Sequence, residues 1–126
     1  MQNYPKQEIF NEDQSFPTRI NKVIKYVKEN HGRQIKENEV AAIACLSEAA
    51  FCRFFKKTTG WRFIDYVNEV RIMEAALLLS ETMDTVANIA YTTGFYIPHY
   101  FNKIFKRSKG ITPREFRQRC CPNPKD

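Results

Sequence analysis

The chain contains the same arrangement of apolar, basic and glycine residues twice. The two copies are residues 40–66, VAAIACLSEAAFCRFFKKTTGWRFIDY, and residues 86–116, VANIAYTTGFYIPHYFNKIFKRSKGITPREF. Their first parts match at an offset of 46, as in Ile43 and Ile89, and their later parts match at an offset of 50, as in Phe55 and Phe105. This pattern arises when two helices have the same apolar faces in both copies and the turn between them differs in length. The sequence therefore predicts a duplicated helix–turn–helix whose second turn is four residues longer.

Apolar spacing and capping residues predict an all-α chain of about seven helices, because no segment alternates with period two for long. Thr18, Ser47 and Asp84 are suited to cap helix N-termini. Thr112, followed by proline and by Glu115 three residues later, forms a strong start for the last helix. The other expected helices cover about 19–30, 37–45, 47–58, 63–80, 85–92 and 97–107.

The fourth helix is expected to be a long spacer between two homeodomain-like helix–turn–helix subdomains. Its apolar residues, which we expect to pack against both subdomains, are Phe63, Tyr66, Val67, Val70, Met73, Ala76, Leu77 and Leu79. The resulting division is an arm or linker at 1–17, a first subdomain at 18–61, a connecting helix at 62–81, a second subdomain at 82–119 and a tail at 120–126.

Positive charge is concentrated in the last quarter of the chain. Residues 94–126 contain eight Lys and Arg and two acidic residues, which accounts for the whole net charge of +6. A basic region beside a helix–turn–helix is typical of proteins that bind phosphate backbones, although a solvated basic tail is the plain alternative. No apolar run approaches the roughly 18 residues that span a bilayer, so we expect no membrane partner and a cytoplasmic, nucleoid-associated protein.

Metal, cofactor and catalytic chemistry have little support in the sequence. The four cysteines include no C-x-x-C pair and the two histidines are far apart; these residues are Cys45, Cys52, Cys120, Cys121, His31 and His99. A zinc site is therefore not expected, and no other cofactor is indicated. A glycine-rich phosphate loop and a Ser/His/Asp constellation are also missing, so we do not expect an enzyme.

The second helix of each copy has one apolar and one polar face. Phe51, Phe54 and Phe55 share the first face by helical spacing, which favours a core stripe over a stacking platform for bases. The opposite faces present Ala49, Cys52, Arg53 and Lys56 in one copy and His99, Asn102, Lys103 and Lys106 in the other. A major groove admits one helix, whose exposed N-terminal side chains reach base edges. Ordinary exposed residues would also explain any single position, but their recurrence in both copies favours recognition helices.

These residues resemble the DNA-binding domain of AraC/XylS-type bacterial transcription regulators over about 19–119. The signature residues in the second copy are Ala90, Gly94, Phe95, Tyr100, Phe101, Lys103, Phe105, Lys106, Gly110, Ile111, Thr112, Pro113, Phe116 and Arg117. The first copy matches through Ala41, Ile43, Ala44, Leu46, Ser47, Phe51, Arg53, Phe55, Lys56, Lys57, Gly60, Phe63 and Tyr66. One departure is Cys45, which stands where the family often has glycine in the first turn.

The resemblance implies that both recognition helices enter successive major grooves of double-stranded DNA, about one duplex turn or roughly 34 Å apart. The base-reading residues would be Ala49, Cys52, Arg53, Pro98, His99, Asn102 and Lys103. The phosphate contacts would come from Ser47, Lys56, Lys57, Lys106, Arg107, Thr112 and Arg114. Family members usually carry a separate sensing or dimerisation domain. The chain is either a stand-alone small regulator or the C-terminal domain of a longer one; we expect the second, with that domain on a missing N-terminal part. RNA polymerase is a further candidate partner.

Two other functions fit the same residues less well. A protein-interaction module would use the helices without binding DNA. An AraC-like domain also occurs in regulators that repair DNA by accepting methyl groups on a cysteine, but their acceptor lies in a zinc module that this chain lacks. Steep salt dependence of duplex binding would separate a DNA-binding domain from an interaction module.

Overall fold

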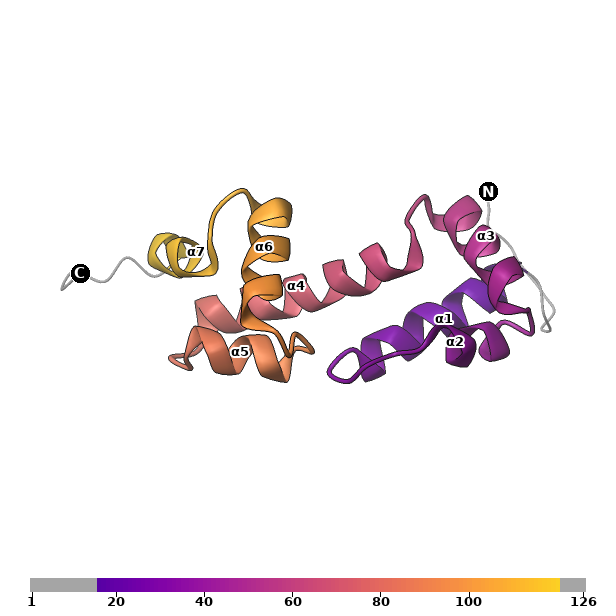
Figure 1. Ribbon diagram of the computed structural model, residues 1–126, viewed down its shortest axis with the longest axis horizontal. Helices are drawn as coiled ribbons and strands as arrows, with labels where there is room; N and C mark the ends of the chain where they lie inside the picture. Colours follow the sequence, from indigo (N-terminus) through magenta and orange to yellow (C-terminus); the bar gives the residue numbers. More distant parts are fainter. Residues whose placement is uncertain (1–15, 121–126) are drawn as a thin grey trace. The chain divides into compact units, whose positions relative to one another are not determined.

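The computed structural model describes residues 16–120, which form seven helices joined by short turns (Figure 1). The helices are α1 Phe16–Asn30, α2 Glu37–Ile43, α3 Glu48–Thr59, α4 Phe63–Glu81, α5 Val86–Thr92, α6 Pro98–Lys109 and α7 Pro113–Cys120. No strand occurs within this range. The predicted all-α class is confirmed, while most of the expected arm and tail lies outside the described residues.

The described residues divide into two compact units. Unit 1 contains residues 16–29 and 35–63, and therefore α1, α2 and α3. Unit 2 contains residues 30–34 and 64–120, and therefore nearly all of α4 together with α5, α6 and α7. The short segment between α1 and α2 thus belongs to the second unit. Each unit contains one helix–turn–helix.

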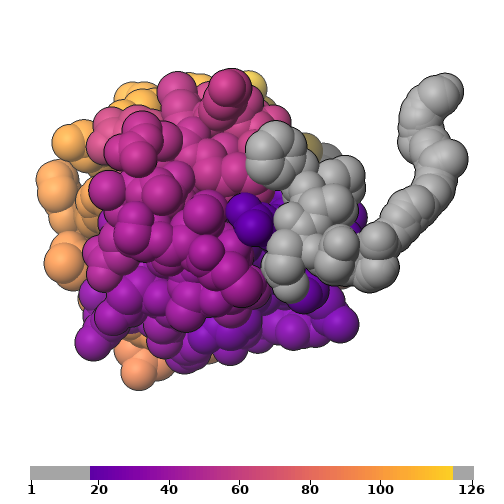
Figure 2. Space-filling view, turned by 90° about the vertical axis from the view of Figure 1, so that its right-hand side faces the viewer, coloured from indigo at the N-terminus to yellow at the C-terminus, as the bar shows by residue number. Residues whose placement is uncertain are grey.

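Unit 1 has an aromatic core at the point where α3 ends and α4 begins. The rings of Phe51 and Phe55 each lie 5.3 Å from the ring of Phe63, centroid to centroid, in edge-to-face geometry. Val23 and Val27 of α1 are fully buried as well. Of the three phenylalanines predicted as a core stripe on α3, two are fully buried and Phe54 is half-buried. Figure 2 shows the outer surface of this unit, with α1 in indigo and α3 in magenta.

Unit 2 is built around a single hydrophobic cluster beneath α6. In Figure 1 α6 stands across α4, with α5 and α7 completing the unit. The buried members of the cluster are Ile72, Ala75, Leu79, Ile89, Ala90, Phe95, Phe101, Ile104 and Phe105. Phe116 of α7 packs against it, with its ring 5.4 Å from that of Phe105. The apolar stripe predicted on α6 is therefore confirmed as core.

The first helix of each copy ends in the same hydrogen-bonded cap. Leu46 N–H donates to the Ala41 carbonyl at 2.9 Å, and Phe95 N–H donates to the Ala90 carbonyl at 2.8 Å. Cys45 and Gly94 have positive φ angles of 62° and 106° at the equivalent position. This arrangement is a Schellman motif, in which a left-handed residue ends the helix.

The caps correct the predicted register of the repeat. The residue ranges of α2 and α5 correspond at an offset of 49, and those of α3 and α6 correspond at an offset of 50. The predicted offset of 46 in the first helix was wrong, and the second turn is one residue longer, not four. A shift of three residues preserves much of the apolar pattern of a helix, because positions three apart share a face. The capping glycine or cysteine is the feature that fixes the register.

Several predicted residues lie elsewhere than expected. Met73 and Leu77 of α4 are 59% and 48% exposed, so they are not core residues. The cap of α5 is Thr85, whose hydroxyl accepts a hydrogen bond from Asn88 N–H at 3.0 Å, and Asp84 lies one residue before it. α1 begins at Phe16, so Thr18 lies within the helix and does not cap it.

Candidate nucleic-acid interface

The N-terminus of α3 is fixed by a side-chain cap, as predicted for Ser47. The Ser47 hydroxyl accepts a hydrogen bond from Ala50 N–H at 3.2 Å, so the hydroxyl is occupied within the protein. Ala49 and Arg53 are exposed on the helix beyond the cap, and Cys52 beside them is half-buried. Phe51 and Phe55 hold the buried face of α3, so these three side chains lie on the opposite side of the helix.

The Cys52 thiol is held in its neutral form. Burial raises the pKa of Cys52, and the carboxylate of Glu37 raises it further through its charge and a hydrogen bond. A neutral thiol is a weak hydrogen-bond donor and behaves as a small hydrophobe. Cys52 is therefore chemically suited to pack against an apolar group, such as a thymine methyl, and poorly suited to a bidentate base contact.

The C-terminal turn of α3 carries the predicted phosphate-binding lysines. Lys56 Nζ donates a hydrogen bond to the carbonyl oxygen of Gly60 at 3.2 Å, and Lys57 is exposed. Gly60 has a φ of 84° and ends the helix by donating from its N–H to the Lys56 carbonyl. The same cap is repeated at Gly110, which donates to the Lys106 carbonyl. In both α3 and α6 a lysine thus lies four residues before the glycine that ends the helix.

The exposed face of α6 carries more polar side chains than the exposed face of α3. Pro98 occupies the first turn, where its missing N–H is tolerated, and Ile97 precedes it as the cap residue without a capping side chain. The predicted base readers Pro98, His99, Asn102 and Lys103 are all exposed. Lys106 and Arg107 follow one turn later and are exposed as well. Imidazole, amide and ammonium groups therefore share the N-terminal half of this helix.

Two hydrogen bonds join α6 to α4, one near each end of α6. Asn68 Nδ2 donates to the Tyr100 hydroxyl at 2.9 Å, and the Ser108 hydroxyl donates to Glu69 Oε1 at 3.0 Å. At the offset of 50, Ala50 takes the place of Tyr100 in α3, and an alanine side chain has no polar group to make such a bond. α6 is thus positioned by polar contacts as well as by its core.

Arg71 of α4 holds the segment between α1 and α2 by hydrogen bonds and also lies beside the turn that precedes α6. Its Nε donates to the His31 carbonyl oxygen at 2.8 Å, and its Nη2 donates to the Arg33 carbonyl oxygen at 2.9 Å. The guanidinium lies 6.0 Å from the ring centroid of Phe95. Gly94 is required here, because a Cβ atom at that position would collide with the His31 carbonyl and with Arg71 Nε. Burial lowers the pKa of Arg71, which remains charged at neutral pH.

The start of α7 forms the predicted capping box. Thr112 N–H donates to Glu115 Oε1 at 3.0 Å, and Glu115 N–H donates to the Thr112 hydroxyl at 3.1 Å. The hydrogen bond from the Thr112 backbone, followed by that from its side chain, holds the pKa of Glu115 below its usual range. The Thr112 hydroxyl is therefore occupied in the cap, as the Ser47 hydroxyl is. Arg114 is exposed beside it.

The structure brings some predicted site residues together. Asn102, Thr112 and Arg114 line one depression of unit 2. Ala49, Cys52 and Arg53 share the outward face of α3 in unit 1. The roles of these residues in base and phosphate contacts remain predictions.

Sequence reasoning missed the polar residues of α4 that position the interface. Asn68 and Arg71 are 5% and 8% exposed, and Glu69 contacts α6 from the same turn. The available signal was a cluster of polar residues within a helix that is otherwise apolar on most sides. Buried polar side chains need partners, so such a cluster indicates long-range hydrogen bonds. The partners themselves lie more than 30 residues away along the chain.

Residues 16–120 contain neither a membrane-spanning helix nor a cluster of metal-binding side chains. Among these residues, none of the helices is both long and apolar enough to cross a bilayer. Over the same range, His, Cys, Asp and Glu side chains do not gather in groups of three or more that could hold a metal ion.

Comparison with known proteins gives one family and a consistent set of relatives. A family model described as a helix-turn-helix domain matches residues 40–119. The HTH-type transcriptional activator RhaS of Klebsiella pneumoniae is 33% identical over 100 residues, which cover 79% of this chain and 36% of that protein. The regulatory protein PocR of Salmonella typhimurium is 30% identical over 123 residues, covering 94% of this chain and 41% of that protein. The chain thus spans about two fifths of the length of these relatives.

Solved structures agree with the fold. The C-terminal domain of the two-component response regulator yesN from Fusobacterium nucleatum has a TM-score of 0.74 and 29% identity, covering 79% of this chain and 98% of that chain. An AraC-type transcriptional regulator from Chromobacterium violaceum has a TM-score of 0.76 and 25% identity, covering 85% and 96%. The DNA-binding domain of AdpA, solved with a target DNA, has a TM-score of 0.78 at 24% identity, covering 86% and 97%, and supports the fold alone.

Proposed function

Because the chain belongs to the AraC-type family of helix-turn-helix domains, we propose that it binds specific sequences of double-stranded DNA and regulates transcription. The observation that carries the proposal is the duplication of a capped helix with an exposed polar N-terminal half. α3 and α6 begin and end at equivalent positions and bury equivalent phenylalanines. A module that only binds other proteins would not require two equivalent helices whose exposed faces can each enter a major groove.

α3 and α6 act as recognition helices in successive major grooves. Arg53 and Lys103 occupy equivalent positions and are suited to guanine, because both can donate to its O6 and N7 atoms. Asn102 is suited to adenine, where an amide can donate and accept at once. Ala49 and Cys52 contribute apolar contacts. His99 and Pro98 complete the face of α6.

Basic and capping residues at the ends of these helices hold the phosphate backbone. Lys56 and Lys57 serve unit 1, and Lys106, Arg107 and Arg114 serve unit 2. Ser47 and Thr112 use their hydroxyls as caps, so we assign their contribution to the helix starts that they cap. Phosphate contacts fix the register of the protein on the duplex and supply most of the sequence-independent affinity.

The remaining parts of a regulator are proposed from the relatives. We place a sensing or dimerisation domain outside this chain, since the matched relatives are more than twice as long. RNA polymerase is a candidate partner of such a regulator, and DNA binding would place the protein at the nucleoid in the cytoplasm. The family indicates a regulator of transcription and not an enzyme.

A salt titration of duplex binding tests this function. The logarithm of the binding constant should fall with the logarithm of salt concentration by about 0.9 for each phosphate neutralised, with roughly six or more phosphates engaged. Lys106→Ala should lower the slope by about one unit and weaken all sequences alike. Asn102→Ala, on the same helix, should leave the slope nearly intact. A flat salt response of the wild-type chain would contradict DNA binding through this surface.

A further inference from the structure

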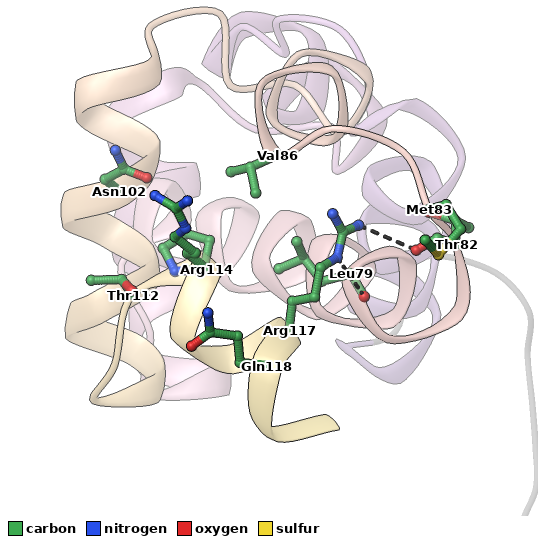
Figure 3. A pocket seen from close by; sticks show the side chains of 10 residues that line it. Leu79, Thr82, Met83, Val86, Asn102, Thr112, Arg114, Arg117 and Gln118 are labelled. Carbon is green, nitrogen blue, oxygen red and sulfur yellow. Dashed lines mark hydrogen bonds between the residues drawn. The ribbon is translucent and has the colours of Figure 1, made fainter. Parts of the chain in front are cut away.

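Unit 2 contains a pocket beside its recognition helix that the proposed function does not explain. The pocket is an open depression where the C-terminal end of α4, the start of α5, α6 and α7 meet, and its volume is about 790 Å³ (Figure 3). We call it the α7 pocket. Its apolar lining comes from Leu79, Met83, Val86 and Pro113. The volume falls within the range of roughly 300–1,000 Å³ that is usual for small-molecule sites.

The polar lining of the α7 pocket is cationic. Arg114 and Arg117 both rise from α7 into it, as Figure 3 shows, and none of its lining residues is acidic. Arg117 is partly occupied, because its Nε donates to the Leu79 carbonyl at 3.1 Å and its Nη2 to the Thr82 carbonyl at 3.2 Å. Within residues 16–120, Arg114 forms no hydrogen bond or ion pair. Its guanidinium is therefore available to an anion.

From this lining we propose that the α7 pocket binds a small organic anion that carries one carboxylate on an apolar body. The carboxylate pairs with the guanidinium of Arg114, whose planar donors match two carboxylate oxygens. The apolar body packs against half-buried Val86 and against Met83, whose side chain is 95% exposed without a ligand, while Leu79 forms the buried floor beneath them. A flexible methionine is well suited to adapt to such a body.

Binding in the α7 pocket opposes DNA binding, and this step rests on the proposed function. Asn102 lines the pocket and is also a proposed base reader of α6. Arg114 and Thr112 line it as well and are proposed phosphate contacts. A ligand carboxylate on Arg114 therefore competes with phosphate for the same donors. By linkage, the ligand lowers the affinity for duplex by the same factor by which the duplex lowers the affinity for the ligand.

An NMR titration of the whole chain with sodium octanoate, without DNA and below its micelle-forming concentration, tests the site. We expect saturable amide shifts that are confined to residues 79–86, 102 and 112–118. Arg114→Ala should weaken octanoate binding by about tenfold or more, since a hydrogen-bonded charge pair is lost. Arg119→Ala is the matched control, because Arg119 is exposed on the same helix and does not line the pocket. It should titrate like the wild type.

Three results would overturn the ligand site. These are the absence of saturable shifts, equal octanoate affinity of the Arg114→Ala and wild-type chains, and equal affinity of the wild-type chain for octanamide, which has no charge. If a duplex shifts the pocket residues while octanoate does not, the α7 pocket belongs to the DNA interface and the proposal is wrong.

Competition with DNA is measured separately, with sodium chloride matching the sodium of octanoate, because duplex binding is sensitive to salt. Octanoate should raise the apparent dissociation constant of the duplex for the wild-type chain. Octanoate binding that leaves this constant unchanged would refute the competition. Failure of the DNA-binding function itself would appear in the salt titration and would leave the NMR result intact.

Discussion

At the scale of single residues, the turns of the two helix–turn–helix units differ in backbone strain. Cys45 has a φ of 62° at the position where the second turn has Gly94. The left-handed conformation brings the Cβ of an L-residue close to the following carbonyl, at a cost of about 1–2 kcal/mol. Glycine avoids this cost but loses about 0.5–1 kcal/mol more backbone entropy on folding. The first turn is therefore strained where the second is not.

Cys45→Gly should stabilise unit 1 by about 0.5–1 kcal/mol, because relief of the strain exceeds the added entropy cost. Urea denaturation would measure the change. Cys45→Ala is the matched control, since alanine keeps the Cβ and the strain, and its stability should stay near that of the wild type. Equal effects of the two substitutions would show that the φ angle of residue 45 is not the source of the gain.

A second residue-scale feature is the buried guanidinium of Arg71, which donates to two backbone carbonyls of residues 30–34. Arg71→Met keeps the length and the apolar contacts of the side chain but leaves both carbonyls without this donor. Hydrogen bonds to charged groups contribute about 1.5–3 kcal/mol each, so unit 2 should lose about 3 kcal/mol of stability. Arg107→Met, at an exposed position, should change stability by less than about 0.5 kcal/mol.

Thermal and urea unfolding of the two variants provide the comparison. If Arg71→Met unfolds at the same urea concentration as Arg107→Met, the hydrogen bonds of Arg71 to residues 30–34 do not stabilise unit 2.

At the scale of elements, α4 shows which of its apolar residues form the core. Leu79 is fully buried, whereas Leu77 is 48% exposed. Leu79→Asp would place an unpaired charge in the hydrophobic cluster and should destabilise unit 2 by more than about 4 kcal/mol. Leu77→Asp, two residues away on the same helix, should cost less than about 1 kcal/mol.

Circular dichroism during heating would distinguish these outcomes. Comparable melting temperatures for the Leu77 and Leu79 variants would contradict the assignment of the buried face.

The elements also show what could be predicted from sequence. The helices, the capping box at Thr112 and the phenylalanine stripes follow from local spacing and were predicted. The buried face of α4 was not, because a helix that is apolar on most sides gives no single direction for its core. The register of the first helix–turn–helix was also missed, since a shift of three residues matches nearly as well as the true alignment.

The positioning contacts of the candidate interface could not be read from local spacing. Asn68 meets Tyr100 and Arg71 meets the backbone of His31 only because distant segments pack together. Nothing in the neighbourhood of these residues specifies their partners. The exposed faces of α3 and α6, by contrast, were predictable, because each lies opposite a strongly apolar stripe.

At the scale of the whole molecule, we propose that the two copies read DNA unequally. α6 presents His99, Asn102 and Lys103, all of which can bond to base edges, and it is fastened to α4 by two hydrogen bonds. α3 presents Arg53 as its one strong reader, beside Ala49 and a neutral thiol. A good base contact supplies about 1–3 kcal/mol of discrimination. The half-site read by α6 should therefore be defined at more positions.

Selection of bound sites from a random pool of duplexes tests the central claim most directly, with the wild-type, Arg53→Ala and Asn102→Ala chains compared. The account predicts two half-sites about 10 base pairs apart, as expected for readers in successive major grooves. Asn102→Ala should relax one base pair in the better-defined half-site, and Arg53→Ala should erase most preference in the other. A single half-site, preferences concentrated under α3, or a selected site unchanged by Asn102→Ala would contradict it.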